Sequence, residues 1–512
     1  MGSQQAAHGP DFASGVPAAE IGEGATLAGR TGEEPILVSR REGRFFAVSG
    51  ACTHYGGPLA EGIVAHDHVR CPWHHACFDL RTGEATAAPA FAPLARWRVD
   101  VEGERLFVRA RIEDEPAAPR APRQQPARII IVGGGAAGFA AADALRRKGF
   151  SGTLTLLSAD ASAPYDRPNL SKDYLAGTAP EEWIPLKDDA YYRDRAIDLR
   201  LDTEAAALDA AKGELITRAG ETLAFDALLL ATGASPVRIA QPGFDLPNVH
   251  ILRSLADARA LIARAQTSRS AAIVGAGFIG LEAAAALRAR GLDVHVIAPD
   301  EVPLQRILGL EVGAFVRRLH EDQGVRFQLS ATAETFDGRR LTLSTGQHVD
   351  ADFVILGVGV RPNIQLAAAA GLAVNAGVEV DAYLRTSAPN VFAAGDIARY
   401  RDARLGEAIR IEHWVAAQRQ GQTAAANMLG EALPFTDAPF FWSNHYDHNI
   451  RYVGHAAGWD ELNIDGSIAA GDFTARYLRD GRLLAAASVG RDRESVAIHE
   501  EMNAARAGAF AS

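Results

Sequence analysis

The chain has 512 residues, with 52 Lys and Arg against 63 Asp and Glu, which gives a formal net charge of -11. At this length a single hydrophobic core is not expected, and three or four domains are the natural expectation. The acidic balance argues against broad nucleic-acid binding, because phosphate contacts need a basic face. No apolar run approaches the roughly 18 residues of a membrane span, and the N-terminus lacks the charged and apolar regions of a signal peptide. We therefore expect neither a nucleic-acid nor a membrane partner.

The first hundred residues contain short β-rich segments that are broken by glycine. Pro35 to Val38 and Arg44 to Val48 are two such segments. Short runs of β-branched and aromatic residues between turn residues are typical of strands. The pattern predicts a small β-sandwich over residues 10–112.

Two cysteines and two histidines stand in this region as Cys52-Thr-His54 and Cys71-Pro-Trp-His74, with sixteen residues between the pairs. Ligands of this kind suit either a zinc ion or an iron-sulfur cluster with mixed ligation. The flanking Gly56-Gly57-Pro58-Leu59 and Phe78-Asp79 resemble the loops that wrap Rieske 2Fe-2S clusters. The resemblance implies that Cys52 and Cys71 hold one iron and that His54 and His74 hold the other, so that the site carries electrons.

Only three cysteines occur in the chain, and Cys77 is left over once the cluster is assigned. We expect no disulfide framework and therefore a reducing, cytoplasmic compartment. In Rieske proteins of high potential an extra disulfide joins the two ligand loops, and the resemblance puts Gly57 and Trp73 at those two positions. The sequence thus resembles the ferredoxin-like branch of low potential.

A composition change marks a linker over residues 113–127. Acidic residues give way there to Pro116, Pro119, Pro122 and Pro126 among Ala, Arg and Gln. Proline at this spacing favours an extended and semi-rigid chain. The segments that follow have the character of an α/β protein.

Two strand-turn-helix segments carry glycine motifs. An apolar strand from Arg128 to Val132 runs into the first motif and then into a helix to about Lys148, and a strand from Ala271 to Val274 runs into the second. Glycines permit the tight turn and the close approach of a pyrophosphate to a helix N-terminus. One match is weak, but two in one chain predict two dinucleotides. The predicted contact positions are Gly133, Gly135, Ala136 and Gly138 in the first motif, and Gly275, Gly277 and Gly280 in the second.

Two distal motifs indicate which dinucleotide binds where. They are Phe225 to Gly233, with Ala231, Thr232 and Gly233 at its end, and Val391 to Asp396, with Gly395 before the aspartate. They resemble those of flavoprotein pyridine-nucleotide oxidoreductases. The resemblance implies a glutathione-reductase-like fold with two Rossmann-like α/β domains, in which the first glycine motif binds FAD, the second binds the nicotinamide cofactor, and Asp396 bonds the ribityl chain. The implied domains are 128–245 with 359–435 for FAD, 246–358 for NAD(P)H, and a C-terminal α+β reductase domain over 436–512.

The segment Pro164 to Lys172, with Arg167 as a cofactor contact, narrows the family. It resembles the NADH-dependent ferredoxin reductases of aromatic-ring dioxygenases and the apoptosis-inducing-factor-like proteins. Disulfide reductases and peroxidases of this superfamily keep a reactive cysteine where this chain has Ser171. Without a thiol no covalent intermediate can form there, so we expect one-electron delivery to a metal centre instead.

The resemblance also implies the residues beside the flavin. Lys172 and Glu282 would pair near the flavin N5 atom, Trp414 would lie by the isoalloxazine, and Trp442 would lie on the side where electrons leave. Core packing is the alternative for Trp414.

Acidic residues that would bind ribose hydroxyls depart from the usual pattern. Asp160 is the candidate for the FAD ribose, and Ala298 stands where a glutamate is expected, with Asp300 and Glu301 just beyond. The acidic pair would repel a 2'-phosphate and no Arg or Lys sits there to accept one, so we expect NADH rather than NADPH. His445 and His448 have a spacing that suits a metal, but without a third ligand we expect them to be solvated or hydrogen-bonded.

Together these motifs predict an electron-transfer chain from NADH through FAD to the 2Fe-2S cluster and on to an external protein or small molecule, such as an oxygenase or a haem monooxygenase. A Rieske oxygenase is disfavoured, because it needs a second iron held by two His and a carboxylate and nucleotide motifs occupy the sequence after the linker. The alternative is a sensor of the apoptosis-inducing-factor type, which binds NADH to change conformation or partners.

Overall fold

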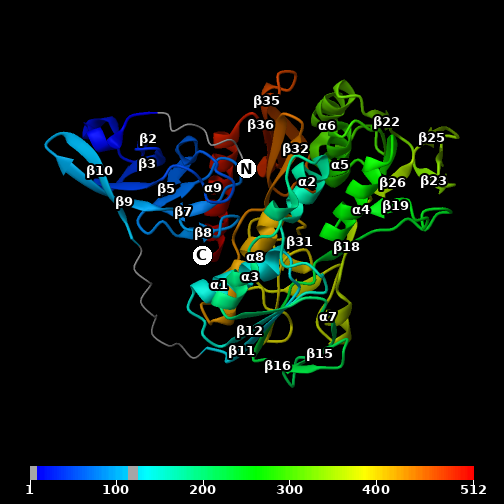
Figure 1. The fold of residues 1–512 in the computed structure, drawn as a ribbon, viewed down its shortest axis with the longest axis horizontal. Helices are drawn as coiled ribbons and strands as arrows, with labels where there is room; N and C mark the ends of the chain where they lie inside the picture. Colours follow the sequence, from blue (N-terminus) through cyan, green and yellow to red (C-terminus); the bar gives the residue numbers. More distant parts are fainter. Residues whose placement is uncertain (1–8, 114–124, 512) are drawn as a thin grey trace. The chain divides into compact units, whose positions relative to one another are not determined.

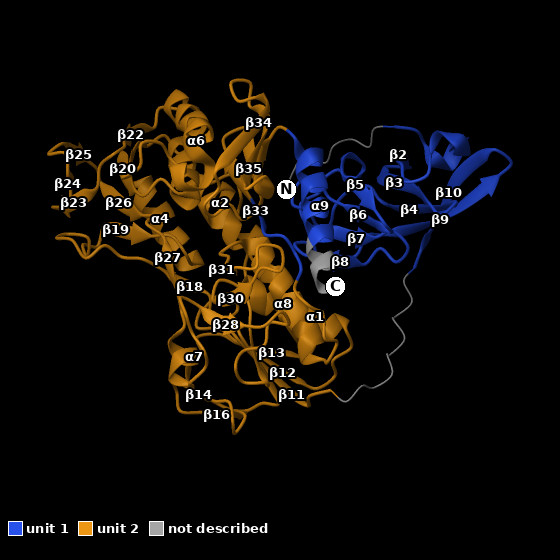
Figure 2. Cartoon of the chain, turned by 180° about the vertical axis from the view of Figure 1, so that it is seen from behind, with its two compact units in different colours: residues 1–123, 436–441, 491–512 blue, residues 124–435, 442–490 orange. Residues whose placement is uncertain are grey.

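The computed structural model describes residues 9–113 and 125–511. The chain divides into two compact units, shown in Figure 2. Unit 1 comprises residues 1–123, 436–441 and 491–512, and unit 2 comprises residues 124–435 and 442–490. Most of the linker predicted over 113–127 lies outside the described residues.

Two antiparallel sheets form most of unit 1. The larger sheet has the order β1 (Val16–Pro17), β10 (Arg105–Ile112), β9 (Arg96–Glu102), β4 (Arg44–Ser49), β3 (Glu34–Arg41) and β2 (Thr26–Thr31). The smaller sheet has the order β5 (Ile63–Ala65), β6 (His68–Arg70), β7 (Cys77–Asp79) and β8 (Ala85–Ala87). Strands predicted at Pro35 and Arg44 are confirmed as β3 and β4.

The strand β3 is buried on both faces. Leu37 joins a cluster that includes Val69 and Phe78 of the smaller sheet, whereas Ile36 and Val38 join a second cluster with Trp97. Because side chains alternate along a strand, the continuous apolar run supplies both clusters. The first cluster packs the two sheets together, and it includes the cysteines Cys52 and Cys71.

Helix α9 (Asp492–Ala511) belongs to unit 1 although it lies near the end of the chain. An ion pair joins Arg70 of β6 to Glu500 of α9. The side chain of Asn503 accepts a hydrogen bond from the backbone N–H of Ala438 at 2.7 Å. The compact unit therefore combines residues from both ends of the sequence.

Unit 2 contains two parallel five-stranded sheets, each with a helix that follows its central strand. The first has the order β13 (Ile197–Arg200), β12 (Thr153–Leu157), β11 (Arg128–Val132), β17 (Ala227–Leu230) and β29 (Val391–Ala393), and α1 (Ala136–Arg147) follows β11. The second has the order β19 (Val249–Ile251), β26 (Phe353–Leu356), β20 (Ser270–Val274), β21 (Asp293–Ile297) and β22 (Arg326–Gln328), and α5 (Phe278–Ala289) follows β20. Both strand-turn-helix predictions are confirmed.

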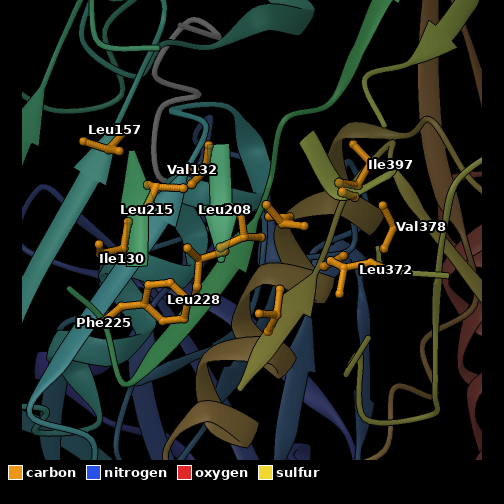
Figure 3. Packing of buried hydrophobic residues seen from close by; sticks show 14 of the residues in the cluster. Ile130, Val132, Leu157, Leu208, Leu215, Phe225, Leu228, Leu372, Val378 and Ile397 are labelled. Carbon is orange, nitrogen blue, oxygen red and sulfur yellow. The ribbon is translucent and has the colours of Figure 1, made fainter. Parts of the chain in front are cut away.

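The core beneath the first parallel sheet is apolar and continuous (Figure 3). Ile130 and Val132 of β11 and Leu228 of β17 pack there against Phe225 and Leu215. Strands of a parallel sheet are covered on both faces, which explains why four residues in succession, 129–132, are buried.

Three-stranded antiparallel sheets and shorter elements complete this part of unit 2. The two meanders are β14 (Ala205–Asp209), β15 (Glu214–Thr217) and β16 (Thr222–Ala224), and β23 (Ala333–Phe336), β24 (Arg340–Leu343) and β25 (His348–Asp350). A pair is formed by β18 (Ala234–Pro236) and β27 (Val360–Pro362), and a further sheet by β28 (Val378–Val380), β30 (Ala398–Arg401) and β31 (Ala408–Arg410). The helices are α2 (Asp173–Ala176), α3 (Asp189–Asp194), α4 (Leu255–Gln266), α6 (Gln305–Asp322), α7 (Gln365–Ala369) and α8 (Trp414–Met428).

Helices α1 and α8 lie side by side in Figure 1. A Cβ atom at Gly421 of α8 would stand 2.1 Å from the carbonyl oxygen of Ala137 in α1. Glycine at that position lets the two helices approach closely. The C-terminal sheet is antiparallel, in the order β32 (Phe440–His445), β33 (His448–Gly454), β36 (Arg482–Val489), β35 (Asp472–Arg479) and β34 (Glu461–Ser467). Within residues 9–113 and 125–511, no helix is both long and apolar enough to cross a membrane.

Candidate redox sites

The four predicted cluster ligands come together in unit 1 as two pairs. Cys52 and Cys71 are both buried, and the two thiols contact each other. The Nδ1 atoms of His54 and His74 lie 3.2 Å apart, and both rings are half-buried. The cysteines therefore face the interior and the histidines face the solvent side.

Each ligand pair stands on a tight loop that backbone hydrogen bonds close. The N–H of Cys52 donates to the carbonyl of Gly57 at 2.9 Å, and the N–H of Cys71 donates to the carbonyl of Ala76 at 2.9 Å. A Cβ atom at Gly57 would stand 2.8 Å from the sulfur of Cys71 and 3.1 Å from the ring of Trp73. The two loops are thus in direct contact, and glycine is needed where they meet.

The paired arrangement suits a cluster of two metal ions better than a single zinc ion. A zinc site needs four ligands around one point, and in the parts of the chain that the structure describes no three His, Cys, Asp or Glu side chains could hold one metal ion. Burial lowers the pKa of His54 to about 3, which keeps the ring neutral, as metal coordination requires. The residues present therefore fit a 2Fe-2S cluster.

His75, the residue after His74, is an additional feature that the sequence did not reveal. Its ring is buried and stacks on Phe440, with the ring centroids 3.8 Å apart. Its Nδ1 atom lies 2.7 Å from Nδ1 of His499 in α9. The second ligand loop is thus tied to the C-terminal helix within unit 1, over a sequence separation that no local pattern reports.

The two glycine motifs of unit 2 have the same local geometry. Gly133 and Gly275 have φ values of 118° and 113°, which favour glycine. A Cβ atom at Gly138 would stand 1.9 Å from the carbonyl oxygen of Gly133, and one at Gly280 would stand 2.3 Å from that of Gly275. Both turns therefore require glycine at their first and last positions.

The middle glycine of each motif faces open space. Among the residues that the structure describes, none lies within 4 Å of a Cβ atom built on Gly277, and only the guanidinium of Arg167 comes within 4 Å of one built on Gly135. These two glycines precede α5 and α1, where unpaired N–H groups of the first helical turn favour a bound anion. Ala136 begins α1 directly after this opening. The space fits the pyrophosphate of a dinucleotide.

Both distal motifs meet the first glycine motif. A Cβ atom at Gly133 would stand 2.2 Å from the carbonyl oxygen of Ala231, and one at Gly395 would stand 3.2 Å from the Cβ of Ala137. The hydroxyl of Thr232 donates to the carbonyl of Asn363 at 2.8 Å. The predicted FAD-contacting segments are therefore assembled around one sheet edge.

Arg253 is a further residue of this assembly that the sequence did not reveal. Its Nη2 atom lies 2.7 Å from Oδ2 of Asp396 and would stand 3.4 Å from a Cβ atom at Gly233. No motif surrounds Arg253, so only the three-dimensional structure brings it to both distal motifs.

Lys172 and Glu282 form a buried ion pair, with Nζ and Oε2 2.8 Å apart. The hydroxyls of Ser171 and Ser443 also donate to the Glu282 carboxylate, at 2.5 and 2.6 Å. Lys172 Nζ lies 6.0 Å from the ring centroid of Trp442. The structure thus brings together three of the four predicted flavin-side residues, and the fourth, Trp414, is half-buried at the start of α8.

Asp160 follows β12, and its carboxylate accepts hydrogen bonds from Ser162 N–H at 3.0 Å and Tyr165 O–H at 2.7 Å. Asp300 follows β21, and its Oδ1 atom lies 3.1 Å from Nε of Arg306 in α6. The sequence expectation that no basic residue stands by the acidic pair is therefore wrong. The first turn of α6 brings Arg306 back to the loop.

His445 and His448 do not form a metal site with a third ligand among residues 9–113 and 125–511. His445 is buried and hydrogen-bonded to His320 at 3.0 Å and Ser443 at 3.1 Å. The expectation of hydrogen bonding is confirmed for His445.

Three family models match consecutive parts of the chain. Residues 14–98 match the Rieske [2Fe-2S] domain, residues 127–421 match the pyridine nucleotide-disulphide oxidoreductase family, and residues 440–509 match the reductase C-terminal family. The second match covers more than half of the chain. The chain belongs to the pyridine nucleotide-disulphide oxidoreductase family. It is a member to which a Rieske domain is fused.

Individual similar proteins indicate which members of the family this chain resembles. Apoptosis-inducing factor 3 of Homo sapiens is 31% identical over 476 residues, which cover 89% of this chain and 78% of the relative. The ferredoxin–NAD(+) reductase component of the anthranilate 1,2-dioxygenase system of Burkholderia cepacia is 40% identical over 372 residues, which cover 72% of this chain and 91% of the relative. A solved complex of putidaredoxin reductase with putidaredoxin has a TM-score of 0.72 and 31% identity, and the match covers 74% of this chain and 94% of that one.

The family and the fitted sites agree on the cofactors. The chain is an NAD(P)H-dependent oxidoreductase that uses FAD, and its Rieske domain carries a 2Fe-2S cluster. Three of the predicted flavin-side residues lie together in unit 2, and the four predicted cluster ligands form another group in unit 1.

Proposed function

We propose that the chain passes electrons from NADH through FAD to its own 2Fe-2S cluster and then to an external acceptor such as an oxygenase. The observation that carries the proposal is that one chain holds both dinucleotide turns and a Cys/His cluster site. Tethering them replaces a diffusional encounter with a high effective concentration. The oxygenase is proposed because a similar protein is named as the reductase component of a dioxygenase system.

Several predicted site residues of unit 2 have proposed parts in this reaction. Gly135 and Ala136 would hold the FAD pyrophosphate, Asp160 its ribose and Asp396 its ribityl chain, with Arg253 holding the Asp396 carboxylate in place. Gly277 would hold the pyrophosphate of the nicotinamide cofactor. When bound, the flavin takes a hydride from NADH and gives up electrons singly. Lys172 and Glu282 would fix charge near the flavin N5 atom, with Trp414 by the isoalloxazine and Trp442 on the side where electrons leave.

The arrangement of domains and the compartment are part of the same proposal. We infer two Rossmann-like domains in a glutathione-reductase-like order, with FAD bound by residues 128–245 and 359–435 and NADH bound by residues 246–358. Residues 436–512 would be the C-terminal reductase domain. Cys52, Cys71 and Cys77 are not joined by disulfides in the described structure, which suits a reducing compartment.

A sensor that binds NADH without rapid turnover is the second candidate. The similarity to apoptosis-inducing factor 3 extends over 89% of this chain and favours it. The two candidates differ in whether electrons leave the flavin quickly, because a sensor needs a long-lived reduced state and a reductase does not.

The proposal that electrons leave the protein through the cluster can be tested with Cys71→Ser and the matched variant Cys77→Ser. Both cysteines are buried in unit 1, but only Cys71 is a proposed ligand. We expect Cys71→Ser to lose the cluster and the reduction of cytochrome c, while NADH-dependent reduction of an artificial dye at the flavin continues. Cys77→Ser should keep both activities. Cytochrome c reduction that survives the loss of the cluster would refute this exit route.

A further inference from the structure

A continuous line of hydrogen-bonded side chains runs through unit 2 from Glu282 to Tyr446. Ser443 Oγ lies 2.6 Å from Glu282 Oε1 and 3.1 Å from His445 Nε2. His445 Nδ1 lies 3.0 Å from His320 Nε2, and His320 Nδ1 lies 3.1 Å from the hydroxyl of Tyr446. Ser443, His445 and His320 are fully buried. The line begins at the ion pair with Lys172 and ends at a half-buried tyrosine.

The hydrogen bonds of this line all point the same way. A carboxylate only accepts, so Ser443 donates to Glu282, and the single hydroxyl proton of Ser443 leaves its oxygen to accept from Nε2–H of His445. His445 Nδ1 must then accept from Nε2–H of His320. His320 Nδ1 in turn accepts from the Tyr446 hydroxyl. Both rings are thereby fixed as the Nε2–H tautomer, and every donor is directed toward Glu282.

The intermediate groups stay uncharged near neutral pH. Burial lowers the pKa of His445 to about 3, and the nearby charges of Lys172 and His448 act in the same direction. Burial and His445 also lower the pKa of His320 well below its ordinary value. Burial raises the pKa of Tyr446 well above its ordinary value, against an opposing effect of Arg288. Groups of this kind can pass a proton on without storing charge.

The outer end of the line is held by an unusual backbone conformation. Tyr446 stands in the turn between β32 and β33 with a φ of 56°. Residues other than glycine rarely adopt this left-handed conformation. The conformation holds the Tyr446 ring 5.1 Å from that of His320, so the strained turn delivers the hydroxyl that completes the line.

We propose that Glu282, Ser443, His445, His320 and Tyr446 form a proton relay between the flavin side and solvent. The inference rests on the proposed function. When NADH reduces the bound flavin, the hydride carries two electrons with one hydrogen nucleus and so adds one negative charge on the flavin side. A proton from solvent offsets that charge. Ser443 gives its hydroxyl proton to Glu282 Oε1 and takes one from His445 Nε2. His445 Nδ1 takes one from His320 Nε2, His320 Nδ1 takes one from the Tyr446 hydroxyl, and Tyr446 takes one from solvent. Each O–H or N–H bond breaks as the next forms, and the reversed line can return the proton to solvent when the electrons leave.

The relay can be tested by timing proton uptake against flavin reduction. Oxidised holoprotein in weak buffer is mixed anaerobically with one equivalent of NADH in the presence of a pH-indicator dye. In the wild type the uptake of one proton should keep in step with flavin reduction. In Ser443→Ala, which breaks the line, and in Tyr446→Phe, which keeps the ring but removes the outer hydroxyl, it should lag by about tenfold or more.

Ser488→Ala is the matched control. Ser488 is equally buried in the same sheet and is hydrogen-bonded to Thr474, so the variant should behave as the wild type. Proton uptake that stays in step with flavin reduction in both Ser443→Ala and Tyr446→Phe would overturn the relay. Failure of NADH to reduce the flavin at all would instead count against the proposed function.

A second measurement needs no turnover. Nitrogen-15 spectra of the histidine rings in the oxidised protein should show His320 and His445 as single, neutral Nε2–H tautomers. In Ser443→Ala the signals of His445 should change. A charged ring, or averaging of tautomers at either histidine in the wild type, would overturn the relay.

Discussion

Lys172 Nζ and Glu282 Oε2 lie 2.8 Å apart, and their side chains keep only 12% and 2% of their exposure to solvent. A buried carboxylate that loses its cation is left uncompensated, which typically costs about 3–5 kcal/mol. We therefore expect Lys172→Met to destabilise the folded chain by about that amount, and Lys172→Met with Glu282→Gln to recover a large part of it. Denaturant unfolding of the holoprotein measures both.

The control for these variants is the Lys148–Glu431 ion pair. It also lies in unit 2, but its side chains are 29% and 28% exposed. Exposed pairs contribute about 0–1 kcal/mol. Lys148→Met should therefore have a small effect. Equal costs for Lys172→Met and Lys148→Met would show that burial does not make the first pair special.

Nucleotide preference depends on Asp300 and its neighbour Arg306. The wild type should favour NADH over NADPH in kcat/KM, because Asp300 and Glu301 repel a 2'-phosphate. Asp300→Ala removes one repulsion and frees the Arg306 guanidinium, which should raise kcat/KM for NADPH by about tenfold, the size of one charge-assisted hydrogen bond. Adding Glu301→Arg should further reduce the difference in kcat/KM between NADH and NADPH.

Arg306→Ala in the Asp300→Ala background is the check on this explanation. It should remove most of the gain, because Arg306 would no longer meet the phosphate. A wild-type preference for NADPH would refute the argument at its first step.

The buried, neutral His445 predicts a pH dependence of stability. Its pKa is about 3 in the folded chain and near 6.5 in a solvated histidine, so the unfolded chain binds a proton below pH 6.5 and the folded chain does not. This contribution to stability is complete above pH 6.5 and is lost as the pH falls toward 3, by about 1.4 kcal/mol per pH unit.

The free energy of unfolding, measured with urea between pH 7.5 and 4.5, should therefore fall less steeply with decreasing pH in His445→Gln than in the wild type. The difference in slope should correspond to about one bound proton. His348→Gln changes an exposed histidine and should leave the slope as it is. The same flattening in both variants would mean that His445 is not the source.

The two ligand loops meet at Gly57 and Trp73, and the residues at this meeting point bear on the reduction potential of the cluster. Rieske centres span about -150 to +300 mV, and the sequence has no cysteine pair to cross-link the ligand loops. Fewer constraints and hydrogen bonds at the sulfurs favour the oxidised form, so the midpoint should lie near the low end. A redox titration followed by electron paramagnetic resonance gives the value. A midpoint near +300 mV would place the cluster with the quinol-oxidising centres.

Local features of the sequence were sufficient for much of the fold. Gly133 and Gly275 lie within short strand-turn-helix segments, and the strand and helix on either side were predicted close to their observed bounds. The cluster ligands were also readable, because each pair lies on one short loop. In both cases the chemistry requires particular residues at fixed short spacing.

Long-range contacts could not be predicted in this way. Arg253 and Asp396 are 143 positions apart, and His320 and His445 are 125 positions apart. Each residue looks ordinary in its own segment, and only tertiary packing gives it a partner. Arg306 was missed for a related reason, since the start of α6 had to be known before its side chain could be placed beside Asp300.

The central claim is that electrons from NADH reach the cluster of the same chain through FAD. Anaerobic mixing of the oxidised holoprotein with NADH, followed by stopped-flow absorbance at the flavin and freeze-quench electron paramagnetic resonance at the cluster, tests it most directly. We expect flavin reduction to be followed by the reduced-cluster signal at a rate that does not depend on protein concentration. A flavin that stays reduced in a long-lived charge-transfer complex, beside a cluster that remains oxidised, would contradict the claim.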